Sequence, residues 1–210
     1  MFTRLDSDHK QVSRRSSVYA RNVVAASQPL AAQAGVQILR NGGNAVDAAI
    51  ATAITLTVVE PTMNGIGSDA FVIVSDNHGI HGFNGSGRSP AAWTPERFAG
   101  HDNMPEHGWD TVTVPGAVDT WVQLSDRFGQ LPFEKLFDSA INYAAQGFAV
   151  SPVIPAGWAP AADDMRSLEG FRTIFIPNGS SATPGGAFPT QTMATTLAQT
   201  AVYRSASFYL

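Results

Sequence analysis

The sequence predicts a globular domain built from layers of helix and sheet, an α/β (α+β) fold. Segments with apolar residues at helical spacing surround two short strand-like runs on either side of a turn, which indicates helix pairs and a β-hairpin. Hydrophobic residues make up 44% of the 210 residues, which is ample for a packed core. Because we find no internal repeat and no linker, we expect a loose leader over residues 1–20 and one domain over residues 21–210.

The first half of this domain is expected to hold a strand, two helices and the hairpin. Residues 22–26 form a short apolar run that predicts a strand, and a helix follows from Pro29 to the stop at residues 41–43, Asn-Gly-Gly. Asn44 can cap a second helix over residues 45–59, which is apolar nearly all round and therefore belongs inside the fold. Strands over residues 70–75 and 79–84 flank a turn at residues 76–78.

The second half is expected to be helical, with one long irregular part. Pro115 opens a helix that ends at Gly129, and Pro132 opens another that ends at Gly147. Residues 151–190 are rich in proline and predict loops with short helical pieces, and a last helix spans residues 192–203.

The composition excludes several classes of function. A net charge of −4 without a basic block excludes binding of nucleic acid through its phosphates, and the absence of cysteine excludes disulfides, thiolate nucleophiles and zinc–thiolate sites. The N-terminus has no apolar signal core, and the longest apolar stretch, Ala48–Val59, is 12 residues, where a bilayer span needs about 20. We therefore expect a cytoplasmic protein with no nucleic-acid and no membrane partner. Charged residues make up only 14%, against roughly 25% in ordinary domains, which indicates that further protein covers part of the surface.

Arg88 is the strongest candidate for a binding residue. It follows two glycines at the end of a predicted strand and precedes Ser89 and Pro90, so its backbone is constrained while its side chain can reach outward. Such an arginine suits bidentate recognition of a carboxylate, but a structural arginine that caps backbone carbonyls fits the spacing equally well.

Other candidate residues favour structural or solvated roles. Gly65 and Gly67 resemble the start of a dinucleotide-binding fingerprint, but a helix precedes them and a strand follows, so a tight turn that needs a permissive backbone is favoured. Asp47 lies in the buried helix and Glu60 lies beside it, and both favour a structural role in capping or pairing. Solvated or unligated positions are predicted for the remaining pairs, His78 with His81, His101 with His107, and Asp163 with Asp164. No serine or threonine lies in a known nucleophile motif, so the residues alone predict no catalytic group, no metal and no cofactor.

Four segments of the chain resemble the γ-glutamyltransferase (γ-glutamyltranspeptidase) family. The most specific is residues 23–74, in which NGGNAVDAA is followed by a buried helix, VEP and GIG. The other three are NGSGRSPAAW at residues 84–93, the block that begins with TVTVPGAVDTW at residue 111, and the final TLAQTAVYRSASFYL. The resemblance covers most of residues 19–210 in the family's order.

This resemblance implies part of an N-terminal nucleophile hydrolase with an αββα sandwich. Members of the family cut their own precursor before a threonine, whose hydroxyl then attacks the substrate while its free amine accepts the proton. The resemblance places that threonine beyond residue 210, in a second, C-terminal piece of the precursor, so no catalytic residue is expected here. It also assigns to Arg88 the binding of the α-carboxylate of a small γ-glutamyl substrate. The acidic residue that usually follows this arginine in the family is replaced by Ser89.

The expected function is therefore that of a fragment of an enzyme that cleaves γ-glutamyl amides, such as glutathione, and transfers the acyl group to water or an amine. Three alternatives stay open: a related amide acylase in the full-length parent, a non-catalytic packing module, and a cofactor-dependent α/β enzyme. A bound nucleotide would distinguish the last of these, and light scattering would distinguish the packing module.

Overall fold

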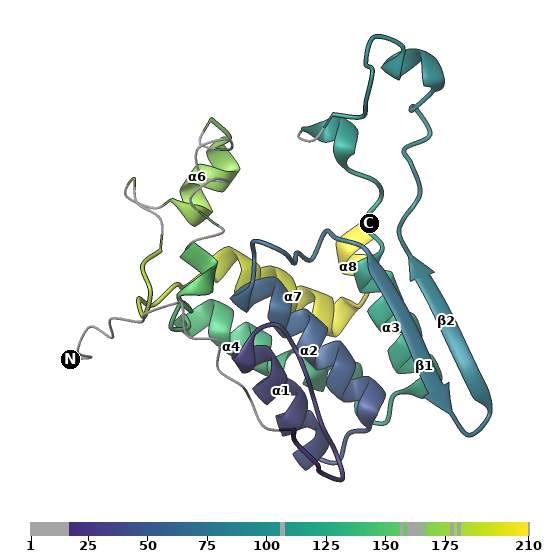
Figure 1. Cartoon of the computed structure of the whole chain (residues 1–210), viewed down its shortest axis with the longest axis vertical. Helices are drawn as coiled ribbons and strands as arrows, with labels where there is room; N and C mark the ends of the chain where they lie inside the picture. Colours follow the sequence, from purple (N-terminus) through teal and green to yellow (C-terminus); the bar gives the residue numbers. More distant parts are fainter. Residues whose placement is uncertain are drawn as a thin grey trace.

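The computed structural model describes residues 17–105, 108–155, 158, 165, 167–176, 179 and 182–209. It consists of a bundle of helices flanked on one side by a two-stranded hairpin (Figure 1). The helices are α1 (Pro29–Arg40), α2 (Ala45–Val59), α3 (Ala117–Phe128), α4 (Asp138–Gln146), α6 (Glu169–Phe175), α7 (Gln191–Tyr203) and the single turn α8 (Ala206–Tyr209). Strands β1 (Ala70–Asp76) and β2 (Gly79–Gly85) form the sheet, and 3₁₀ turns lie at Pro95–Phe98, Trp109–Thr111 and Phe133–Phe137.

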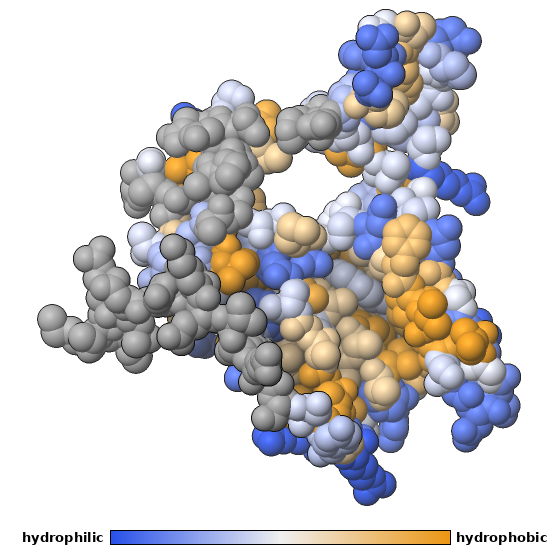
Figure 2. All heavy atoms as spheres, viewed as in Figure 1, coloured by the Kyte–Doolittle hydropathy of each residue, from blue (hydrophilic) through white to orange (hydrophobic). Residues whose placement is uncertain are grey.

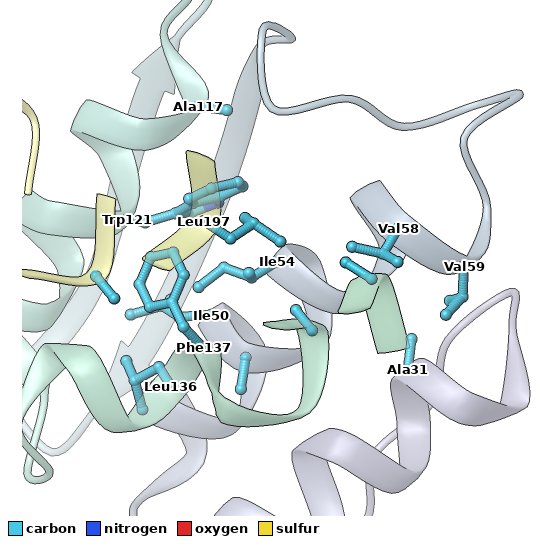
Figure 3. Close-up of a cluster of buried hydrophobic side chains, with 14 of the residues drawn as sticks. Ala31, Ile50, Ile54, Val58, Val59, Ala117, Trp121, Leu136, Phe137 and Leu197 are labelled. Carbon is cyan, nitrogen blue, oxygen red and sulfur yellow. The ribbon is translucent and has the colours of Figure 1, made fainter. Parts of the chain in front are cut away.

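Helix α2 is the centre of the molecule, as its apolar sequence predicts. It contacts α1, α3 and α4, and Ile50 and Ile54 are almost completely buried. Figure 3 shows these two side chains facing Leu136, Phe137 and Leu197 from the second half of the chain. Burial of a side chain of this size stabilises the fold by about 1.5–3 kcal/mol, so this cluster joins the two halves.

The threonines of α2 are compatible with this buried position because their hydroxyls find partners within the helix. Thr52 donates to the carbonyl of Ala48, and Thr55 donates to the carbonyl of Ala51, each at 2.7 Å. A buried hydroxyl without a partner would cost free energy, and these bonds remove that cost.

Helix α1 begins and ends where the sequence predicts, but the strand predicted before it is wrong. Pro29 is the first helical residue, and Gly42, with φ +92°, follows the C-cap residue Asn41. Residues 23–26 belong to no strand, although they lie along α2 and line an apolar groove with it. A strand requires a hydrogen-bonded neighbour, and the described residues offer none to this segment.

The second half contributes α3, α4 and α7 to the core. The helix predicted from Pro132 begins as a 3₁₀ turn before it becomes α4, and Gly147 ends it with φ +83°. Helix α7 packs along α4 and supplies Leu197 to the core. In the proline-rich part, Trp158 packs edge-on against Phe175 and Phe188, with ring centroids 5.3 and 5.0 Å apart.

The hairpin has one covered face and one open face. β1 and β2 pair antiparallel, with Ala70 opposite Gly85 and Asp76 opposite Gly79, and α3 lies against the face that carries Val72 and Phe83. The alternate residues Phe71, Ile73 and Ile80 are 70%, 79% and 77% exposed. Figure 2 shows an apolar patch over this part of the molecule. Within the described residues, no helix is long and apolar enough to cross a membrane.

Candidate active-site half

Arg88 lies at the rim of an open hollow of about 1030 Å³. The end of β2, the start of α3 and the short helix α8 surround this hollow, so the site joins segments from the middle and the end of the chain (Figure 1). Its polar lining residues are Asn84, Ser86, Arg88, Asp119, Thr120, Gln123, Ser205 and Tyr209.

The backbone of Arg88 is fixed by the segment before α3. The amide of Val114 donates to the carbonyl of Arg88 at 2.9 Å, and the hydroxyl of Thr113 donates to the carbonyl of Ser86 at 3.2 Å. Gly87 adopts φ +71°, and a Cβ there would overlap the carbonyl oxygen of Val114. Glycine is therefore required at this position both for its conformation and for the close approach.

A second close approach locks the same two segments together. A Cβ on Gly116 would overlap the carbonyl oxygen of Gly85, and a Cβ on Gly85 would overlap the hydroxyl of Thr120. The end of β2 thus lies directly against the first turn of α3. Because one of these contacts is made by the backbone of Gly85 and the other by a side chain of α3, the position of Arg88 is set by the sheet and the helix together.

The side chain of Arg88 is exposed to solvent and makes no hydrogen bond or ion pair with any residue that the structure describes. This differs from Arg97, which binds Asp110 at 2.6 Å, and from Arg204, which binds Asp126. A guanidinium on a fixed backbone at the rim of a hollow can bind a carboxylate through two parallel hydrogen bonds. Its role as a substrate-binding residue stays a prediction.

The N-terminal amides of α3 are occupied by partners from distant parts of the chain. The carbonyl of Ser68 accepts from the amides of Gly116 and Ala117 at 3.2 and 3.0 Å. The hydroxyl of Tyr209 accepts from the amide of Asp119 at 3.3 Å and donates to the carbonyl of Pro115 at 2.6 Å. Partial burial raises the pKa of this hydroxyl, so it remains protonated and able to donate near neutral pH.

The structural roles predicted for Asp47 and Glu60 are confirmed. Asp47 is fully buried and accepts from the amides of Asn44, Gln130 and Leu131 at 3.0–3.2 Å. Glu60 ends α2 and accepts from the hydroxyl of Ser27 and the amide group of Asn64 at 2.6 and 2.9 Å. Neither carboxylate lines the hollow at Arg88.

Of the two hairpin histidines, His81 contacts protein side chains, and His78 donates its backbone amide to the carboxylate of Asp76 at 2.7 Å. His81 contacts Asp76 through Nε2 at 3.2 Å, and its Nδ1 lies 3.1 Å from the guanidinium of Arg127. No group of three or more metal-ligating side chains comes together in the part of the chain that the structure describes. His101 is exposed, while His107, Asp163 and Asp164 lie outside the described residues.

The turn at Gly65 and Gly67 is present, but its predicted reason is wrong. Both residues lie between α2 and β1, as expected, yet neither has a positive φ, and a Cβ would meet open space at Gly65 and only the edge of Pro115 at Gly67. The permissive backbone is needed instead at Gly87. Sequence reasoning also missed Tyr209, because a contact over 94 residues leaves no local pattern.

Comparison with known proteins gives a consistent result. A family model described as Gamma-glutamyltranspeptidase matches residues 31–210. A glutathione hydrolase-like YwrD proenzyme from Bacillus subtilis is 33% identical over 198 residues, which are 93% of this chain and 38% of that protein. The chain therefore spans little more than a third of the length of this relative.

Two solved structures have the same fold over nearly the whole chain. A cephalosporin acylase from Bacillus halodurans is 42% identical with a TM-score of 0.91, covering 99% of this chain and 41% of that one. A gamma-glutamyltranspeptidase from Pseudomonas nitroreducens, solved in complex with L-DON, is 30% identical with a TM-score of 0.83, covering 90% of this chain and 56% of that one.

Proposed function

This chain belongs to the gamma-glutamyltranspeptidase family, and from that premise we propose that it forms the carboxylate-binding half of an amide-cleaving active site. The whole enzyme would cleave a γ-glutamyl amide and transfer the acyl group to water or to an amine. The observation that carries this proposal is the guanidinium of Arg88, which lies exposed on a fixed backbone at the rim of the hollow.

Arg88 would bind and orient the substrate by its α-carboxylate. Hydrogen bonds to a charged group contribute about 1.5–3 kcal/mol each, so a bidentate pair can hold one end of a small substrate. The acyl carbon then has a defined distance from the anchored carboxylate, which allows a nucleophile elsewhere in the enzyme to reach it. The role of Arg88 is therefore to position the substrate.

The nucleophile would come from further sequence. In this proposal the family's threonine lies beyond residue 210, and the second piece of the precursor packs on the open face of the hairpin. The exposed side chains of Phe71, Ile73 and Ile80 support such packing, because an apolar face of this kind is stabilised when protein covers it. We propose that the isolated chain has no turnover.

A related amide acylase is the second candidate. The 42% identity to the Bacillus halodurans cephalosporin acylase favours it, as does Ser89 in place of an acidic residue. For both candidates we propose that a carboxylate of the acyl group binds Arg88. A γ-glutamyl group carries an α-amine beside that carboxylate, whereas preference for an acyl group without this amine, such as glutaryl, would indicate the acylase. The two functions therefore differ in what the rest of the site must recognise.

One chimera tests both candidates. Residues 1–210 replace the matching part of the Bacillus halodurans protein. Release of the aniline is measured with a γ-glutamyl anilide and with a glutaryl anilide, which lacks the α-amine. Faster turnover of the γ-glutamyl compound supports the first candidate, and faster turnover of the glutaryl compound supports the acylase. The chain alone should release aniline from neither compound. Release by the chain alone would overturn the proposal that the nucleophile lies outside these residues.

Variants of the same chimera test Arg88. Arg88→Lys should raise the KM of the preferred anilide about tenfold or more with a smaller change in kcat, because the planar fork is lost while the charge stays. Arg97→Lys, which changes an arginine already bound to Asp110, is the matched control and should leave KM unchanged. An unchanged KM for Arg88→Lys would assign Arg88 a structural role.

A further inference from the structure

We infer that Tyr209 is a positioning residue for Arg88, because its hydroxyl holds the segment to which the backbone of Arg88 is bonded. This inference rests on the proposed function of Arg88 as the carboxylate-binding residue. It assigns a purpose to α8, a single helical turn whose side chains line the same hollow.

The hydroxyl of Tyr209 takes the place of a missing helix cap. The N-cap residue of α3 is Gly116, which has no side chain to accept from the amides of the first turn. Tyr209 accepts from the amide of Asp119 at 3.3 Å and donates to the carbonyl of Pro115 at 2.6 Å. One hydroxyl thus binds both the first turn of the helix and Pro115, which lies two residues before the helix begins.

The held segment connects directly to Arg88. Val114 precedes Pro115, and its amide donates to the carbonyl of Arg88 at 2.9 Å. The close approach of Gly87 to the carbonyl of Val114 leaves no room for the two stretches to slide past each other. A displacement of Pro115 therefore changes the position of the Arg88 backbone.

The turn before helix α8 contacts α3 through Arg204, which fixes the position of Tyr209 in α8. Arg204, in the turn before α8, binds Asp126 near the end of α3 and lies 5.1 Å from the ring centroid of Phe133. Arg204 is the only non-glycine residue in the described part of the chain with a positive φ, at +59°. The segment from Arg204 to Tyr209 is thus fastened to α3 near both ends of that helix.

The chemistry of the hydroxyl agrees with this role. Both of its hydrogen bonds go to backbone groups, and burial raises its pKa, so it donates to Pro115 at any pH near neutrality. The aromatic ring contributes packing, since Phe208 and Tyr209 meet edge-on with centroids 5.0 Å apart. Removal of the hydroxyl alone therefore separates positioning from packing.

The test compares Tyr209→Phe with the unchanged 210-residue chain by NMR, and Tyr203→Phe, at a 64% exposed position of α7, is the matched control. Amide hydrogen exchange of Val114 and Asp119 reports whether Tyr209 holds the segment before α3. Titration with L-glutamate, followed at the side-chain Nε of Arg88, reports ligand binding. We expect Tyr209→Phe to speed hydrogen exchange at both amides about tenfold and to raise the Kd of L-glutamate about three- to tenfold. Tyr203→Phe should change neither.

The two readouts fail separately. Unchanged exchange at Val114 in Tyr209→Phe would show that Tyr209 does not hold the Val114–Arg88 contact. Faster exchange with unchanged L-glutamate affinity would overturn the role of Tyr209 in positioning Arg88 for a ligand. If L-glutamate does not perturb Arg88 in the unchanged chain, the proposed carboxylate-binding function fails, and the exchange data still decide whether Tyr209 holds the Val114–Arg88 contact.

Discussion

Replacement of Asp47 by alanine tests a polar contact between the two halves of the fold, next to the apolar cluster that joins them. Asp47 is fully buried in the first turn of α2 and accepts from the amides of Asn44, Gln130 and Leu131. The last two belong to the segment between α3 and α4. The variant therefore loses a capping box and a link across more than 80 residues of sequence in one step.

The expected loss follows from the number of amides left without an acceptor. A buried donor without a partner costs about 1–3 kcal/mol, and the partly buried position of these three amides favours the lower end. We therefore expect Asp47→Ala to lower the free energy of unfolding by about 4 kcal/mol. Domains have about 5–15 kcal/mol in total, so this loss is a large fraction of the stability.

Urea unfolding followed by circular dichroism measures this loss. With a slope of about 2 kcal/mol per molar urea, 4 kcal/mol corresponds to a midpoint lower by about 2 M. Asp47→Asn retains one acceptor oxygen, so its urea midpoint should lie between those of the unchanged chain and Asp47→Ala. This variant keeps the comparison usable if Asp47→Ala does not fold. Asp102→Ala removes the same charge from an exposed loop and should stay within about 0.5 kcal/mol. A midpoint for Asp47→Ala no lower than that of Asp102→Ala would refute the reasoning.

Two further substitutions test the site and the hairpin. Gly87→Ala should lower the melting temperature more than Gly42→Ala, because both glycines have a positive φ but only a Cβ at Gly87 would overlap Val114; equal losses in thermal unfolding would contradict the close approach. Asp76→Asn should weaken the decline of stability in acid. The amide of His78 donates to Asp76 and lowers the pKa of its carboxyl, so the ionised carboxylate stabilises the fold above its unfolded pKa of about 4. That stabilisation is lost as the pH falls through the lower pKa of the folded state. An identical pH profile of urea midpoints in the two proteins would count against that assignment.

Local signals in the sequence predicted most of the helices and the hairpin correctly. Pro29 and Gly42 bound α1, and Asn44 caps α2. The two strand-like runs on either side of the turn at residues 76–78 place β1 and β2 within one residue of their observed ends. Each of these signals acts through the backbone of a few neighbouring residues, so it can be read without knowledge of the rest of the fold.

Features that depend on distant partners were missed or misjudged. Residues 22–26 have the composition of a strand, but strand formation needs a paired neighbour, which the described residues do not supply. The need for glycine was assigned to Gly65 and Gly67, whereas it arises at Gly87 from contact with Val114, 27 residues later. The contact of Tyr209 with Pro115 is of the same kind.

The hairpin has a consequence for how this chain behaves during expression. An antiparallel pair uses only half of its backbone amides and carbonyls between its strands, and the other half points outward along the two long edges. β1 carries no lysine and no proline, which are the residues that usually discourage additional strands from joining at an edge. High concentration or heat should therefore convert free chains into insoluble β-rich material that nucleates at the hairpin.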